Sequence, residues 1–97
     1  MTENRAEKIA VRRKRLRFRA QRRGFKEVDL IFGTFASTYL ETLDEDELDR
    51  FEMLLDAPDH AVFDWLQDNA PVPPSYDNSV FARMKALCHR KAPTWNV

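Results

Sequence analysis

The chain has 97 residues, enough for one domain with one hydrophobic core but little depth for an enclosed active site. Its 43% hydrophobic content and seven Phe provide side chains that fill a core, which argues against disorder. The formal net charge is zero, and the two glycines, Gly24 and Gly33, stand apart. The sequence therefore contains no Gly-rich phosphate loop, which argues against a nucleotide enzyme.

The charges are sorted along the chain. Eleven of the sixteen Lys and Arg residues lie within the first 26 residues, and fourteen of the sixteen acids lie between residues 27 and 77. A bipolar surface of this kind orients an encounter with a partner whose own charges are patterned. The alternative is that both runs are solvated helix faces, and the sequence leaves this choice open.

Cys88 is the only cysteine, so it cannot form an internal disulfide, and this suits a reducing compartment. The longest stretch without charge runs over residues 30–40, far short of the roughly 20 residues that cross a bilayer. No secretory signal is visible. We therefore expect a protein that does not insert into a membrane.

The first predicted helix extends from about Arg5 to Arg23 and is mostly basic. Its apolar stripe is thin and comprises Ile9, Leu16 and Phe18. Helix propensity more than apolar packing favours this element, so we expect it to fray before Val11.

The second predicted helix is strongly apolar. Side chains recur at spacings of three and four, as on a buried helix face: Phe25, Val28, Phe32, Phe35 and Tyr39. Leu30, Ile31 and Leu40 fill neighbouring faces. We expect this helix to lie at the centre of the core.

Three shorter helices follow. Thr42 and Glu45 have capping-box spacing, which predicts the start of the third helix. Pro58 suits the first turn of the fourth, and Asp77 or Ser79 can cap the fifth after a stiff loop with three prolines. The inward-facing side chains are Leu48, Phe51, Leu54, Leu55, then Val62, Phe63, Trp65, Leu66, and finally Phe81, Met84, Leu87, Cys88.

No segment alternates with a period of two, so the predicted fold class is all-α: a compact five-helix bundle in a single domain. We place this domain at residues 16–91. A basic N-terminal extension, partly helical or frayed, covers residues 1–15, and a C-terminal tail covers residues 92–97. Trp65 and the phenylalanines are expected in the core.

The sequence gives little support for a catalytic site or a metal site. His60 and His89 are far apart, and neither has a second His or Cys at metal-ligand spacing. Cys88 lies on an apolar stripe, where a buried structural role is expected. A general acid and base pair would need a desolvated carboxylate, whereas the acids here are in the most polar part of the chain. We predict no catalytic residue, no metal site and no enzymatic activity.

The junction between the first two helices is the exception. Gly24 ends the first helix and suits a turn with positive φ or close backbone approach. Arg23 and Glu27 flank it four residues apart, with Arg first, the weaker order for an intrahelical pair worth about 0.3 to 0.5 kcal/mol. Stability is thus a poor reason for this arrangement. A helix stop followed by a dipole-compatible Glu remains the alternative to recognition.

Residues 23–27, Arg-Gly-Phe-Lys-Glu, match an Arg-Gly-x-x-Glu signature between two helices. Three blocks follow in order: Leu-Asp-Glu-Asp-Glu-Leu at 43–48, Phe-Glu-Met-Leu-Leu-Asp at 51–56 and Phe-Asp-Trp-Leu at 63–66. From about Leu16 to Arg90 the chain resembles the succinate dehydrogenase assembly factor 2 family, called SdhE in bacteria. The resemblance implies a five-helix protein that promotes covalent attachment of FAD to a flavoprotein subunit.

In this family a histidine of the client attacks the flavin's methyl carbon, so the resemblance implies FAD on the client and no cofactor of the helper's own. The implied partner is the flavoprotein subunit of succinate dehydrogenase or fumarate reductase. The implied partner-binding residues are Arg23, Gly24 and Glu27, with Arg19, Arg22, Phe25 and Asp29 around them.

The basic arm lacks the length and composition of a mitochondrial transit peptide, which favours a bacterial cytoplasmic protein. We expect it to be monomeric when free. The alternative function is a small nucleic-acid-binding module that uses the basic arm from Arg12 to Lys26, in which Phe18 and Phe25 interleave with arginines. The resemblance favours the assembly factor and therefore no nucleic-acid partner.

Overall fold

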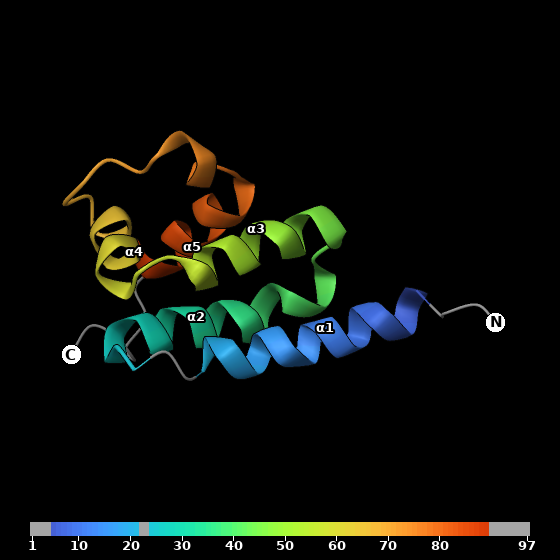
Figure 1. The fold of residues 1–97 in the computed structure, drawn as a ribbon. Helices are drawn as coiled ribbons and strands as arrows, with labels where there is room; N and C mark the ends of the chain where they lie inside the picture. The colour runs from blue at the N-terminus through green and yellow to red at the C-terminus, as the bar shows by residue number, and fades with distance from the viewer. Residues whose placement is uncertain (1–4, 22–23, 90–97) are drawn as a thin grey trace.

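The computed structural model describes residues 5–21 and 24–89, and within these ranges the backbone is helical with no strand (Figure 1). The α-helices are α1 (Arg5–Ala20), α2 (Lys26–Tyr39), α3 (Glu45–Asp56), α4 (Asp59–Leu66) and α5 (Ser79–His89). Two 3-10 turns, η1 (Leu40–Thr42) and η2 (Pro74–Tyr76), lie between them. The predicted all-α fold with five helices is confirmed. Arg22, Arg23 and Trp95 lie outside the described residues.

Helix α2 occupies the centre, as its apolar periodicity predicted. Figure 1 shows α1 and α2 as an antiparallel hairpin, with α3 running back along α2 and α5 behind them. The buried side chains of α2 are Val28, Ile31, Phe32, Phe35 and Ala36. Phe51 of α3 meets two of them, with its ring centroid 5.2 Å from Phe35 and 5.9 Å from Phe32. Leu30, expected to fill a neighbouring face, is instead exposed.

Helix α1 contributes little apolar surface to the core. Leu16 and Ala20 are buried, and Ile9 packs partly against them. The prediction that every phenylalanine fills the core is wrong for Phe18, whose exposed fraction is 58%. The helix also ends earlier than predicted, because the Gln21 amide bonds the Phe18 carbonyl in a tight final turn. The described helix is continuous from Arg5, and the division of the chain at residue 15 stays a prediction.

The capping box of α3 lies two residues beyond the predicted one. Asp44 accepts a hydrogen bond from the Glu47 amide at 2.9 Å, and the Glu47 side chain accepts one from the Asp44 amide at 3.0 Å. Thr42 belongs to η1, where its hydroxyl donates to the Tyr39 carbonyl at 2.8 Å. The Thr42 hydroxyl thus forms its hydrogen bond within η1, and the N-cap of α3 is Asp44 instead of Thr42.

Asp44→Ala should lower the free energy of unfolding by about 1 kcal/mol, because the Glu47 amide loses its capping acceptor. Thr42→Ala is the matched control and should cost less, since its exposed hydroxyl meets a carbonyl that water also reaches. Urea denaturation of both variants measures the difference. Equal costs, or a larger cost at Thr42, would restore the capping box expected from the sequence.

Two other helix starts also differ from the prediction. Pro58 is the N-cap of α4, not a residue of its first turn, because its ψ of 140° is extended; its carbonyl accepts from the Val62 amide. Helix α5 is capped neither by Asp77 nor by Ser79. The Asn78 side chain accepts from the amides of Val80 and Phe81, at 3.0 and 3.1 Å. Its oxygen satisfies two amides of the first turn.

The ends of α4 and α5 are tied together. His89 Nε2 lies 2.9 Å from the Leu66 carbonyl, and Gln67 Nε2 donates to Cys88 Sγ at 3.3 Å. Cys88 is half-buried, not buried as expected, although desolvation still raises the pKa of its thiol. A raised thiol pKa keeps the unreactive protonated form dominant, in agreement with a structural role.

Candidate protein-docking site

The turn that joins α1 to α2 contains Gly24 in a conformation that L side chains rarely adopt. Its φ is +90°, and the residue is exposed. A Cβ at this position would meet nothing within 4 Å, so backbone conformation, and not crowding, demands glycine. The positive φ expected from the sequence is confirmed. None of the described residues covers the position that a Gly24 side chain would occupy.

Phe25 connects this turn to α4. It is the N-cap of α2, with extended backbone, and its carbonyl accepts the first helical hydrogen bond from the Asp29 amide at 2.8 Å. Its half-buried ring packs on two rings of α4. The ring centroid lies 5.2 Å from His60, edge to face, and 5.3 Å from Phe63. Phe25 thus connects the exposed turn to the fourth helix.

Charged side chains surround Gly24. Lys26 and Glu27 are exposed, whereas Asp29 is half-buried. Glu27 and Asp29 lie in the first turn of α2, where the helix dipole favours a negative charge. The other members of the predicted site, Arg22 and Arg23, lie outside the residues that the structure describes. Their roles stay a prediction.

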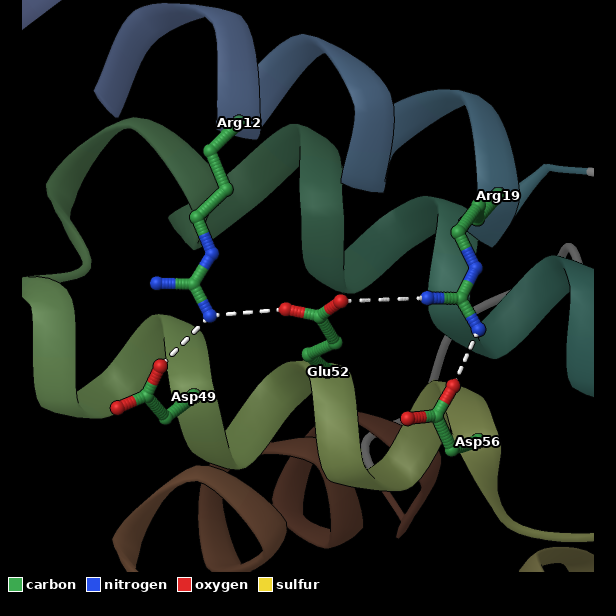
Figure 2. A network of polar contacts seen from close by, with 5 residues as sticks. All are labelled: Arg12, Arg19, Asp49, Glu52 and Asp56. Atoms are coloured by element: carbon green, nitrogen blue, oxygen red, sulfur yellow. Dashed lines mark hydrogen bonds and ion pairs between the residues drawn. The ribbon is translucent and has the colours of Figure 1, made fainter. Parts of the chain in front are cut away.

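Arg19, a further member of the predicted site, contacts α3. Figure 2 shows a chain of ion pairs that joins α1 to α3 in the order Asp49, Arg12, Glu52, Arg19, Asp56. Arg12 NH2 lies 2.7 Å from Asp49 Oδ1 and 2.8 Å from Glu52 Oε1. Arg19 lies 3.6 Å from Glu52 Oε2 and 2.6 Å from Asp56 Oδ1. This network gives Arg19 a structural role within the fold.

Other arginines also bond inside the molecule. Arg13 donates to the carbonyls of Leu40 and Leu43, at 3.0 and 2.7 Å, and so supplies the positive charge that the last turn of α2 lacks. Arg17 pairs with Glu41 at 2.9 Å, and its hydrogen bond lowers the pKa of that carboxyl. Much of the charge that the sequence separates into two blocks is therefore paired in the fold.

A similar pair fixes α5. Arg83 binds Glu47 at 2.8 Å and lies over the Tyr39 ring, 5.7 Å from its centroid. Glu47 consequently closes the capping box of α3 and holds α5 with the same carboxylate. These pairs between helices were not predicted from the sequence.

We call residues 24–27 the docking turn. A shallow depression lies next to it. It is lined by Gln21, which directly follows α1, and by residues of α2: Asp29, Leu30, Gly33, Thr34 and Ser37. This depression was not predicted from the sequence. The available signal was the spacing of Leu30, Gly33 and Ser37 at three and four residues, with small side chains on one helix face.

The described residues contain no group of three or more His, Cys, Asp or Glu side chains placed to hold a metal ion. His60 and His89 instead contact Phe25 and the Leu66 carbonyl, respectively. None of the helices over residues 5–21 and 24–89 has the length and apolar character needed to span a bilayer. The features described above define a small helical protein with an exposed, glycine-marked turn.

Comparison with known proteins identifies the family. The sequence profile described as flavinator of succinate dehydrogenase matches residues 14–88, and the chain belongs to this family. A protein named FAD assembly factor SdhE, from Acetobacter pasteurianus, is 37% identical over 76 residues, which cover 78% of this chain and 70% of that protein. This is an assembly-factor family and not a family of catalytic enzymes.

Mitochondrial relatives are also similar. Proteins named succinate dehydrogenase assembly factor 2 from Drosophila virilis and Debaryomyces hansenii are 33% and 36% identical over 81 residues. The matches cover 81% and 80% of this chain, and 51% and 57% of the relatives. The chain thus spans a little over half the length of these two proteins.

Proposed function

We propose that this protein binds the flavoprotein subunit of succinate dehydrogenase, fumarate reductase or both, and promotes covalent attachment of FAD to that subunit. Membership of the flavinator family carries the proposal, because the matched region, residues 14–88, includes the whole docking turn. The exposed Gly24 at positive φ supports a docking role at this position. The docking residues are Arg23, Gly24 and Glu27, with Lys26 beside them.

In the proposed mechanism the client contains the reacting groups, and the helper holds them in position. Gly24 presents bare backbone, so the client surface can approach the turn more closely than a side chain would permit. Arg23 and Glu27 then pair with charged groups of the client and hold its unfinished flavin domain in a reactive arrangement. Fixing two reactants in this way accelerates their reaction without any covalent step on the helper.

The remaining proposals concern the free protein. We propose that it binds no flavin of its own, is monomeric, and works in the cytoplasm of a bacterium. The lone, half-buried Cys88 suits a reducing compartment. The structure supports nucleic-acid binding less than the basic sequence does, because four arginines of the basic arm form hydrogen bonds within the molecule: Arg12, Arg13, Arg17 and Arg19.

The test is covalent flavin in the client, measured as in-gel fluorescence of the flavoprotein subunit in cells that express each variant. Gly24→Arg should abolish most of the covalent flavin, because a bulky side chain then stands where the client approaches. Arg23→Ala and Glu27→Ala should each reduce it strongly, since removal of one member of an interfacial charged pair costs about 2 to 5 kcal/mol.

Asp46→Ala is the matched control for Glu27→Ala. Both acids are exposed and lie in the first turn of a helix, so the two variants lose a similar contribution from the helix dipole. The control should leave covalent flavin unchanged. Normal flavin in all three turn variants, with each shown to be folded, would disprove the proposed docking site.

A further inference from the structure

Within residues 24–89, two α-helices begin without a side-chain cap, and the N-cap residue of one packs on the first turn of the other. The N-cap residues Phe25 of α2 and Pro58 of α4 make no side-chain capping hydrogen bond. By contrast, α3 begins with a complete capping box and α5 with the Asn78 cap. Something other than a polar cap must therefore hold the start of α2 in place.

Aromatic contacts supply that restraint. Phe25 packs on two side chains of α4, edge to face on His60 and tilted against Phe63, with centroid distances of 5.2 and 5.3 Å. Both separations are within the range in which aromatic pairs attract each other. The neighbouring residues Gly24, Lys26 and Glu27 are exposed, so the Phe25 ring is the part of the turn that reaches into the molecule.

We infer that α4 fixes the docking turn through Phe25, with His60 and Phe63 as positioning residues. The inference rests on the proposed function, since it concerns how the turn is presented to the client. The backbone at Gly24 adopts a positive φ that glycine can readily leave, because glycine has few steric restrictions. Without the ring contacts, the turn and Glu27 would sample several directions, and binding would carry the cost of ordering them.

His60 and Phe63 do not contact the client in this scheme. They act by restricting Phe25, which lies 35 residues before His60 in the chain. The sequence hides this relation, because the Arg-Gly-x-x-Glu signature fixes neither the residue after glycine nor any residue of α4. The specific prediction is that an aromatic ring at position 63 matters for docking more than its apolar volume does.

The experiment uses the whole protein and measures two quantities for each variant. One is the dissociation constant for the flavin-free flavoprotein subunit of succinate dehydrogenase from the same organism. The other is the NMR hydrogen-exchange rate of the Asp29 amide, which bonds the Phe25 carbonyl. Phe63→Leu should weaken binding by about tenfold, near the upper range for the loss of an aromatic pair. It should also accelerate exchange at Asp29.

Tyr76→Leu is the matched control, because it removes a different ring contact of α4. Tyr76 is half-buried and packs on Trp65, with centroids 4.8 Å apart. It should lose comparable stability yet retain wild-type affinity and wild-type exchange at Asp29. Phe63→Tyr and His60→Phe keep a ring against Phe25 and should both retain wild-type affinity, whereas His60→Ala should not.

Wild-type affinity and Asp29 exchange in Phe63→Leu would overturn the inference, as would an equal loss of affinity in Tyr76→Leu. Loss of binding in His60→Phe would assign His60 a direct contact with the client instead. Glu27→Ala separates this inference from the proposed function. If it abolishes binding while Phe63→Leu does not, only the role of α4 fails; if it binds normally, the docking site itself fails.

Discussion

Phe51→Ala should lower the free energy of unfolding by about 3 to 5 kcal/mol, a large part of the roughly 5 to 15 kcal/mol typical of small domains. Phe51 is fully buried and its ring contacts both Phe32 and Phe35 of the central helix. Truncation removes these contacts and leaves a cavity where α2 meets α3. Thermal unfolding followed by circular dichroism should show a decrease in Tm of more than about 10 °C.

Phe18→Ala is the control with the same chemical change. The Phe18 side chain is 58% exposed on α1, so truncation there removes little buried surface. Its Tm should remain within a few degrees of wild type, about 0.5 kcal/mol in free energy. A Phe18→Ala variant as unstable as Phe51→Ala would mean that the outer face of α1 packs against part of the molecule in solution.

The second large effect concerns Glu52, the central carboxylate of the chain of ion pairs in Figure 2. Glu52→Gln removes the charge that Arg12 and Arg19 share but nearly preserves side-chain shape. We expect a loss of about 1 to 2 kcal/mol, because the Arg12 and Glu52 side chains are only 23% and 29% exposed, between the fully exposed and fully buried cases. Urea denaturation at low ionic strength measures this loss.

Asp49→Asn is the matched control, since it removes a terminal and more exposed carboxylate of the same network. Its side chain is 65% exposed, and an exposed pair contributes about 0.2 to 1 kcal/mol. The gap between the two variants should shrink in 1 M NaCl, where the Debye length is only about 3 Å. Equal losses at low salt, or a gap that salt does not change, would contradict the assignment of the larger loss to the charge of Glu52.

The fold was predictable where one local pattern dominates. The apolar spacing of Val28, Phe32 and Phe35 identified the central helix, and Pro58 marked a boundary between helices to within one residue. Cap positions were less predictable, because several residues in a row can accept the same hydrogen bond. Asp77, Asn78 and Ser79 are all residue types that cap helices, and the structure uses Asn78.

The sequence predicted the backbone conformation of the candidate site but not the side-chain contacts around it. Gly24 predicted a turn with a positive φ or a close backbone approach, and the structure has the positive φ. The sequence could not show that Arg19 pairs with Glu52 and Asp56, because the partners are 33 and 37 residues away and come together only when α1 packs on α3. The contact of Phe25 with His60 depends on tertiary packing in the same way.

The chain of ion pairs between α1 and α3 has a consequence for synthesis on the ribosome. Arg12 is translated 37 residues before Asp49 and 40 residues before Glu52. At about 5 to 20 residues per second, roughly 2 to 8 s pass between the synthesis of Arg12 and the synthesis of its partners on α3. The ion pairs between α1 and α3 can therefore form only after most of α3 has been synthesised.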